Sequence, residues 1–148
     1  MNDIYNYQFL TDHLSSSGMP TAEQMKEIAD DKVRVVINLA LVTSEGALLD
    51  EDKLVQSLGM EYVHIPVEWN DPTRENLDDF FGAMEGHKSE KVHVHCQANY
   101  RASAFIMLYR VLRLGWDQAD AIPVMEKMWN PEDFPIWQKF IDEQLSGR

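Results

Sequence analysis

The sequence predicts an α/β fold: a small, mostly parallel sheet flanked by helices. The first observation is that short apolar, β-branched runs alternate with segments of helical periodicity, as in strands joined by helical crossovers. The second is that helical patterns complete the chain after the last predicted strand, so helices are expected on both faces of the sheet. The length of 148 residues and the hydrophobic fraction of 45% suit one domain with one core, covering residues 1–148.

The first half of the chain contains two predicted helices and two predicted strands. Thr21 is a helix N-cap with Gln24 three residues later, which is the spacing of a capping box. The apolar, β-branched residues 33–39 predict a buried strand, and residues 62–67 predict the next one. Between them, Asp50 is expected to cap a short helix. The apolar stripes of the two helices are Met25, Ile28 and Ala29, and Leu54, Val55 and Leu58.

The second half continues with a third helix, a third strand and further helices. Thr73 begins the third helix, and residues 91–95 form the strand that precedes the cysteine. Residues 101–114 are apolar on most faces, which predicts a central, buried helix. Pro123 is expected to kink or end the next helical segment. The apolar stripes of the third and last helices are Leu77, Phe80, Phe81 and Met84, and Trp137, Phe140, Ile141 and Leu145.

The most informative segment is 95–101, with the sequence His-Cys-Gln-Ala-Asn-Tyr-Arg, which holds the only cysteine of the chain. A strand leads into it and a helix leaves it, so the loop amides and the helix dipole are expected to create a positive potential at Cys96. Such surroundings favour a thiolate, and Arg101 adds a planar fork that can hold two oxygens of an oxyanion. The alternative is an inert core cysteine. The strand–helix junction and the nearby arginine favour an active-site loop, called here the Cys96 loop (residues 96–101).

A second candidate segment follows the predicted strand 62–67. In parallel sheets, sites form at the C-terminal ends of the strands, so the loop after this strand and the Cys96 loop are expected at the same edge. The side chains that this brings into range are Glu68, Trp69, Asn70 and Asp71. A later loop, residues 129–135, is expected to pack its aromatic side chains on the core rather than to form a lid.

The composition of the chain excludes some classes of binding partner and indicates a cellular location. The formal net charge of −12, from 25 acidic and 13 basic residues, argues against nucleic acid and anionic membranes, whose phosphates need clustered Lys and Arg. No apolar run reaches the ~18 residues of a membrane span, and the N-terminus lacks a signal-peptide pattern. One cysteine excludes an internal disulfide, so a cytoplasmic location is expected. Nothing indicates the oligomeric state.

A metal site is the weaker interpretation of the two histidines that precede the Cys96 loop. His93 and His95 alternate along the predicted strand, but a metal site needs three or four donors and no others lie nearby in the sequence. A hydrogen-bonded structural pair is therefore expected. Neither a metal nor another cofactor is predicted.

The strand–Cys–loop–Arg–helix arrangement resembles the cysteine-based phosphatases of the tyrosine and dual-specificity class, with His95 in the place of the histidine that precedes their nucleophile. The wider chain resembles a bacterial family of tyrosine-phosphatase-like domains that are also found joined to β-lactamase-like hydrolases. The segments that carry this likeness are 17–21 (Ser-Gly-Met-Pro-Thr), 36–39 (Val-Ile-Asn-Leu) and 65–67 (Ile-Pro-Val). The resemblance implies hydrolysis of phosphate monoesters, on a small molecule or a phosphoprotein, through a phosphocysteine intermediate.

The resemblance also assigns roles to residues. Cys96 is the nucleophile, and the phosphate is bound by Arg101 together with the loop residues Gln97, Ala98, Asn99 and Tyr100. Asp71, 25 residues before Cys96, corresponds to the general acid, with Glu68 as the alternative. The Asp71-Pro72-Thr73 segment is equally a helix-start signal, so Asp71 has a structural interpretation as well.

The chain departs from the usual phosphatase motif at two points. Four residues separate Cys96 from Arg101 where five are usual, and Asn99 stands where the bacterial family has glycine; asparagine tolerates the left-handed conformation, so the loop can still curl. Ala102 replaces the hydroxyl residue that helps to release the cysteine, with Ser103 one place later.

Two alternatives to a phosphatase follow from these departures. Rhodanese-type sulfurtransferases also have four residues in this loop, and a catalytically weak anion-binding or regulatory domain would keep the cradle without turnover. The carboxylate-bearing loop 68–71 favours the phosphatase, because phosphoryl transfer from an alcohol needs a proton donor and a persulfide relay does not.

Overall fold

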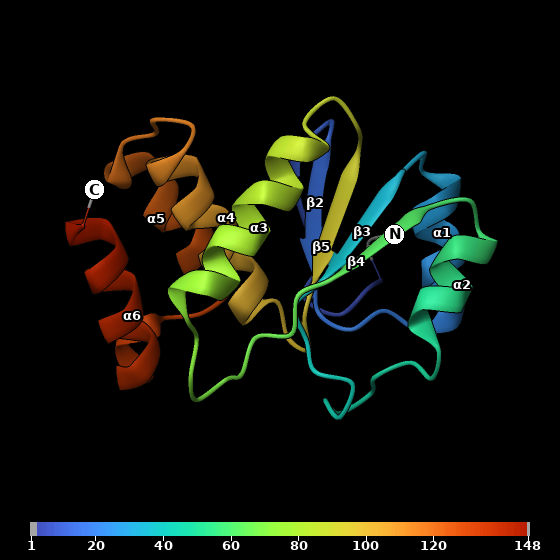
Figure 1. Cartoon of the computed structure of the whole chain (residues 1–148), viewed down its shortest axis with the longest axis horizontal. Coiled ribbons are helices and arrows are strands. Elements are labelled where there is room, and N and C mark those ends of the chain that lie inside the picture. The colour runs from blue at the N-terminus through green and yellow to red at the C-terminus, as the bar shows by residue number, and fades with distance from the viewer. Residues whose placement is uncertain (1–2, 148) are drawn as a thin grey trace.

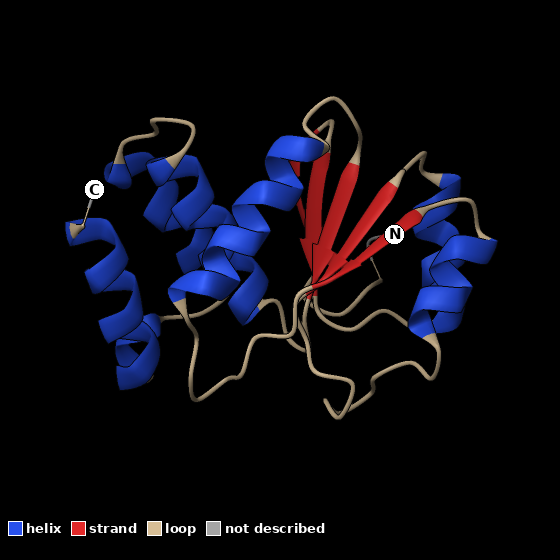
Figure 2. Cartoon of the chain, in the orientation of Figure 1, coloured by secondary structure: helices blue, strands red, loops and turns tan. Residues whose placement is uncertain are grey.

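The computed structural model describes residues 3–147, which form a five-stranded sheet between two groups of helices (Figures 1 and 2). The predicted α/β fold with a mostly parallel sheet is confirmed. The strands are β1 (Gln8–Thr11), β2 (Leu14–Ser17), β3 (Val35–Asn38), β4 (Glu61–His64) and β5 (Val92–His95). The helices are α1 (Ala22–Asp30), α2 (Glu51–Ser57), α3 (Arg74–Gly86), α4 (Tyr100–Leu112), α5 (Gln118–Glu126), the 3-10 turn η1 (Pro131–Asp133) and α6 (Pro135–Ser146).

The sheet has the strand order β1-β2-β5-β3-β4, with β5 at its centre. All neighbouring strands run parallel except β1, which pairs antiparallel with β2. His95 at the end of β5 is in register with Ser17 of β2 and with Asn38 of β3. The parallel strands therefore end together, and the loops that follow them meet at one edge of the sheet.

The sequence pattern did not predict the β1–β2 hairpin. Its second strand contains Ser15, Ser16 and Ser17 in a row, a composition that indicates a turn rather than a strand. All three serines are nevertheless buried, because the strand lies beside β5 and its hydroxyls bond inside the sheet. The predicted strands were also too long: residues 65–67 and residues 33, 34 and 39 lie outside β4 and β3.

Two apolar cores lie on opposite faces of the sheet. Val35, Ile37 and Val94 belong to the larger core, shared with α3, α4 and α6, while Val36 faces the smaller core, shared with α1 and α2. Figure 1 shows these two groups of helices on either side of the strands. The helix α4 is buried from Arg101 to Val111, as predicted for a central helix.

The helix ends confirm some of the expected signals and correct others. Thr21 and Thr73 both form complete capping boxes, with Gln24 and Asn76. Asp50 is an exception: it precedes α2 in a left-handed conformation (φ 54°) and makes no capping hydrogen bond. The helix α5 runs through Pro123 and ends at Glu126, three residues later.

Candidate active site

Cys96 lies immediately after β5, at the C-terminal end of the central strand, and α4 begins at Tyr100. Its N–H donates to the carbonyl oxygen of Ser17 at 3.4 Å, which joins the start of the Cys96 loop to the neighbouring strand β2. Cys96 is 1% exposed. The nucleophile predicted from the sequence is thus held at the bottom of the loop, at the point to which the N-terminus of α4 is directed.

Asn99 gives the Cys96 loop its curl. Its backbone is left-handed (φ 69°, ψ 11°), the conformation expected from its place in the motif. Its side chain is fully buried, and Nδ2 donates to the Asn6 carbonyl at 2.9 Å and to the Ser16 hydroxyl at 3.0 Å. A glycine could adopt the same backbone but could make neither of these bonds.

The carbonyl groups of the Cys96 loop are bound from its outer side. The Gln97 carbonyl accepts the N–H of Met19 at 2.9 Å, and the Ala98 carbonyl accepts Nδ2 of Asn6 at 2.9 Å. Gly18 makes this close approach possible, since a Cβ atom there would lie 2.6 Å from the Gln97 oxygen. With the carbonyls fixed on the outer side, the amides of the loop are left free for the inner side.

These amides are free donors. Within residues 3–147, the N–H groups of Gln97, Ala98, Tyr100 and Arg101 donate to no other group of the chain. Those of Tyr100 and Arg101 are in the first turn of α4, where an α-helix leaves its amides unpaired. The loop therefore offers a set of backbone donors at a helix N-terminus, which is a site suited to an oxyanion.

Arg101 closes one side of the cradle. It is 5% exposed, and its NH1 group donates to the Val67 carbonyl at 2.8 Å, which attaches the guanidinium to the loop after β4. No carboxylate of the described residues forms an ion pair with it. The positive charge is thus positioned but not neutralised, as binding of an anion requires.

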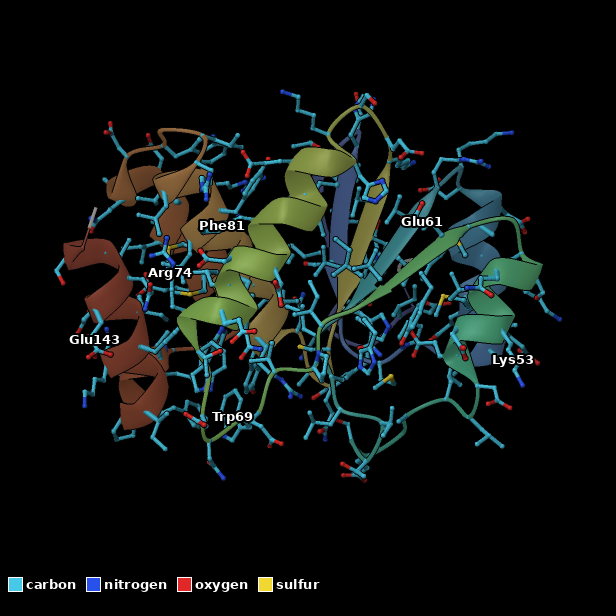
Figure 3. The ribbon with its side chains drawn as sticks, in the orientation of Figure 1. Lys53, Glu61, Trp69, Arg74, Phe81 and Glu143 are labelled. Carbon is cyan, nitrogen blue, oxygen red and sulfur yellow. The ribbon has the colours of Figure 1, made fainter. Side chains whose placement is uncertain are left out.

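A cavity of about 380 Å³ opens above the Cys96 loop. Three different segments form its aromatic wall. Trp69 comes from the loop between β4 and α3, Tyr100 from α4, and Phe134 from the junction of η1 and α6. Figure 3 shows Trp69 at the edge where the parallel strands end. The residues that line the cavity are Trp69, Cys96, Gln97, Ala98, Tyr100, Arg101 and Phe134.

The aromatic wall is fixed by the C-terminal part of the chain. The Trp137 indole donates to the Trp69 carbonyl at 2.7 Å, and Tyr100 stacks on Trp129 with ring centroids 5.0 Å apart and planes 2° from parallel. Phe134 meets Trp69 edge to face at 5.3 Å. Residues 129–135 therefore pack their aromatic side chains inward, as predicted, although the sequence did not indicate that Phe134 lines the cavity.

The two candidate acids lie outside the cavity wall. Glu68 and Asp71 are both exposed, and they are joined by a turn in which the Asp71 N–H donates to the Glu68 carbonyl at 3.1 Å. Trp69, between them, is the residue of this loop that lines the cavity. The structure thus brings Cys96 and Arg101 together and places both carboxylates nearby in the chain but on the solvent side of the same loop.

Ser103 does not replace the hydroxyl that is missing at Ala102. Its Oγ donates to the Tyr100 carbonyl at 3.1 Å and accepts the indole N–H of Trp129 at 3.0 Å. Both bonds hold it against the aromatic wall rather than the cavity.

His93 and His95 have different partners. The Ser17 hydroxyl donates to the Gly18 carbonyl and so accepts from Nε2 of His93 at 2.8 Å, while the Ser15 hydroxyl donates to Nδ1 at 2.7 Å. Burial lowers the pKa of His93 to about 3, so this ring is neutral. His95 instead contacts Glu51 of α2, a residue that the sequence did not indicate, with Nε2 and Oε2 2.6 Å apart.

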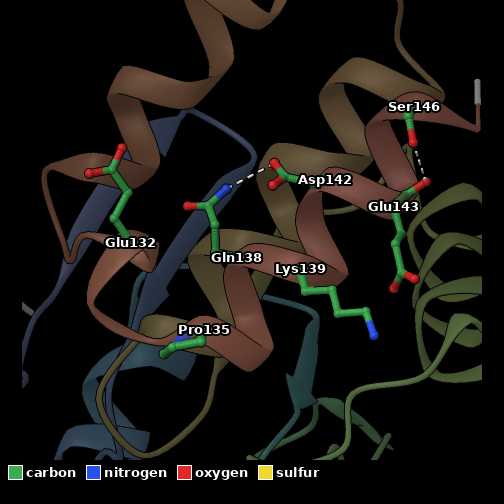
Figure 4. Close-up of a pocket in the computed structure, with 7 residues that line it drawn as sticks. All are labelled: Glu132, Pro135, Gln138, Lys139, Asp142, Glu143 and Ser146. Atoms are coloured by element: carbon green, nitrogen blue, oxygen red, sulfur yellow. Dashed lines mark hydrogen bonds between the residues drawn. The ribbon is translucent and has the colours of Figure 1, made fainter.

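Two other hollows contain none of the predicted site residues. One, of about 680 Å³, lies at the ends of β3 and β4 and is lined by residues that include Asn38, Glu51 and Tyr62. The other is a shallow groove on the outer side of α6 (Figure 4), lined by Glu132, Pro135, Gln138, Lys139, Asp142, Glu143 and Ser146. Across residues 3–147, no helix has both the length and the apolar character needed to cross a membrane.

Comparison with known proteins identifies the family. Residues 10–139 match the family model described as a DSP-PTPase phosphatase fused to NAD+ kinase. A candidate phosphatase (DUF442) from Shewanella putrefaciens CN-32 is similar over 99% of this chain and 92% of its own, with 40% identity and a TM-score of 0.89. No curated protein matches.

More distant structures share the fold. TpbA from P. aeruginosa, solved in complex with pTyr, has 16% identity and a TM-score of 0.73 over 92% of this chain and 82% of its own. PTPMT1 has 20% identity and a TM-score of 0.73 over 95% of this chain and 96% of its own. The family match, the strong likeness to the Shewanella protein and the cysteine–arginine loop agree: the chain belongs to the family of tyrosine- and dual-specificity-type phosphatases.

Proposed function

We propose that this phosphatase is cysteine-dependent and hydrolyses phosphate monoesters through a phosphocysteine intermediate. The observation that carries the proposal is that Cys96, four unpaired amides and an unneutralised Arg101 surround one cavity. The amides and the guanidinium are donors arranged before the substrate arrives, so they stabilise the charge on the equatorial phosphate oxygens at little further cost in reorganisation.

In the first step, the Cys96 thiolate attacks phosphorus. The S–P bond forms as the bond to the leaving oxygen breaks, and Asp71 gives its proton to that oxygen. In the second step, Asp71 takes a proton from water, the water oxygen attacks phosphorus, and the S–P bond breaks to release phosphate and the thiolate. Because Asp71 is exposed beside Trp69, its role requires the loop after β4 to turn the carboxylate toward the bound ester, and Glu68 is the alternative donor on the same loop.

The cavity favours an ester with an aromatic or apolar group next to the phosphate. Trp69, Tyr100 and Phe134 provide flat apolar surfaces in the same cavity that Cys96 and Arg101 line. The structurally similar TpbA binds pTyr, which has this combination of groups. The same aromatic wall makes a sulfurtransferase the less favoured alternative, since a small sulfur donor has no apolar group to pack against it.

The test is hydrolysis of p-nitrophenyl phosphate by the wild-type chain, with Cys96→Ser as the inactive control. The serine variant is expected to lose activity, because its hydroxyl is barely ionised at neutral pH. Arg101→Lys keeps the charge but loses the bidentate fork, so it is expected to weaken both phosphate binding and turnover. If the wild type hydrolyses no ester but transfers sulfur from thiosulfate to cyanide, the sulfurtransferase interpretation is correct instead.

A further inference from the structure

Glu51 and His95 form a buried pair directly behind the nucleophile. Nε2 of His95 lies 2.6 Å from Oε2 of Glu51, and the two side chains are 0% and 5% exposed. His95 is the residue before Cys96, and its Nδ1 lies 3.3 Å from the Cys96 carbonyl oxygen. A carboxylate from α2 is thus connected through one imidazole ring to the backbone of the catalytic cysteine.

The partners of His95 determine its proton content. A carboxylate oxygen and a carbonyl oxygen can only accept hydrogen bonds, so a ring that bonds to both must donate from both nitrogens. The contacts of His95 are therefore those of a doubly protonated ring paired with a carboxylate.

His93 shows the contrast two residues earlier on the same face of β5. Its partners are the hydroxyls of Ser15 and Ser17, which can each donate or accept, so a neutral ring satisfies both of them. Burial lowers the pKa of His93 to about 3, and the charge of His95 adds to this effect. One strand thus carries a neutral histidine held by serines and a cationic histidine held by a glutamate.

The other groups around the pair do not compete with Glu51. Tyr62 of β4 is neutral, because burial, with smaller contributions from Glu51 and Asp52, raises its pKa to about 12. Asp50 and Asp52 line the cavity at the start of α2. Neither pairs with His95, and among the described residues Glu51 is its only ionic partner.

We propose that Glu51 is a positioning residue, which keeps the His95 ring doubly protonated and oriented beside Cys96. The inference rests on the proposed function in taking Cys96 as the nucleophile. Nδ1 of His95 contacts the Cys96 carbonyl and Glu51 bonds to the other ring nitrogen, so the ring lies between the carboxylate and Cys96 and the pair presents its positive end to the cysteine. Glu51 acts only through His95 and does not touch the substrate.

The first measurement uses the wild-type protein with 15N-labelled histidine. At pH 7, NMR is expected to show both ring nitrogens of His95 protonated and only one of those of His93. A neutral His95 ring at this pH would overturn the proposal. The result does not depend on a variant that folds.

The second measurement is the rate of Cys96 alkylation by iodoacetamide as a function of pH. Glu51→Gln can still accept from the ring but no longer stabilises its charge, so the pH of half-maximal alkylation is expected to rise by about one unit. His95→Asn is expected to give a similar rise, and the double variant no more than His95→Asn alone, because residues that act through one another are not additive.

The matched control is Glu61→Gln, which removes the carboxylate of the exposed pair that Glu61 forms with His87 at 3.0 Å. It is expected to leave the alkylation profile unchanged. An unchanged or lowered midpoint in Glu51→Gln, or an additive shift in the double variant, would overturn the proposal. Alkylation requires no phosphate ester, so the result is separate from whether the chain hydrolyses one.

Discussion

The backbone N–H of Met19 and the carbonyl of Gln97 are 78 residues apart in sequence and joined by a hydrogen bond of 2.9 Å. This bond places the segment after β2 against the outer side of the Cys96 loop. The residue before Met19 is Gly18, and a side chain at position 18 would have no room beside the Gln97 oxygen. The shape of the Cys96 loop therefore depends on residues far from it in the sequence.

Gly18→Ala is expected to move the Cys96 loop. The new Cβ would lie 2.6 Å from the Gln97 oxygen and 2.7 Å from the Tyr5 ring, and the backbone oxygen cannot move without the loop. We expect a lower melting temperature and weaker phosphate binding, measured by thermal unfolding with and without phosphate. Gly82→Ala is the control: that position in α3 is open, and alanine there should stabilise the helix by about 0.5–1 kcal/mol.

Replacing Asn99 separates its backbone role from its side-chain role. Asn99→Gly keeps the left-handed conformation and loses the bonds to Asn6 and Ser16, so a loss of about 1–3 kcal/mol is expected. Asn99→Ala loses the same bonds and adds the strain of a left-handed alanine, about 1 kcal/mol more. Urea unfolding measures both values. Equal stabilities of the two variants would mean that the loop relaxes to another backbone.

The general acid can be identified from the leaving-group dependence. Asp71→Asn is expected to slow hydrolysis of an alkyl phosphate by roughly 10²–10⁴-fold, and that of p-nitrophenyl phosphate by less, because a good leaving group needs little protonation. Glu68→Gln on the same loop is the matched comparison. If only the Glu68 variant slows the alkyl ester, Glu68 is the acid and Asp71 belongs only to the turn before α3.

The absence of a hydroxyl at Ala102 predicts slow release of the phosphocysteine. Ser103 cannot take over, because its hydroxyl is bound to Tyr100 and Trp129. Rapid-quench measurements with p-nitrophenyl phosphate are expected to show a burst of nitrophenol equal to the enzyme concentration. Ala102→Ser should speed the steady state without changing the burst. A linear time course in the wild type would place the slow step before the intermediate.

The stability of the protein should rise with pH between about 3 and 6.5 because of His93. Its pKa is lowered to about 3 in the folded state, so in this window the unfolded chain binds the proton and the native state does not. The stability that the native state has while His93 is neutral is complete above pH 6.5, and it is lost as pH falls toward 3. His93→Gln should flatten this part of the curve of unfolding free energy against pH. If the curve of His93→Gln runs parallel to that of the wild type, His93 is protonated in the folded state.

Local signals predicted much of the fold. The capping box at Thr21, the helix start at Thr73 and the buried run of α4 depend on residues within one or two turns, and the structure has each of them. The β1–β2 hairpin could not be predicted in this way. Its serines have little strand propensity, and two of them, Ser15 and Ser17, bond to His93, 76–78 residues away.

The same distinction holds for the site. The order of Cys96, Asn99 and Arg101 along the chain indicated a cradle, and Asn99 has the predicted left-handed backbone. Glu51 carried no such signal, because a glutamate at the start of a helix is usually a surface residue. Its contact with His95 spans 44 positions and depends on how α2 packs on the sheet.

The support of Trp69 by Trp137 has a consequence for biosynthesis. Trp137 lies in α6, and its indole holds the loop that carries one wall of the cavity. While the ribosome is still making α5, the central strand and Cys96 have already been synthesised, but Phe134 and Trp137 have not. The nascent chain at that stage holds a cysteine without a finished binding pocket. The cavity above the Cys96 loop is therefore complete only after translation has passed α6 and this helix has docked.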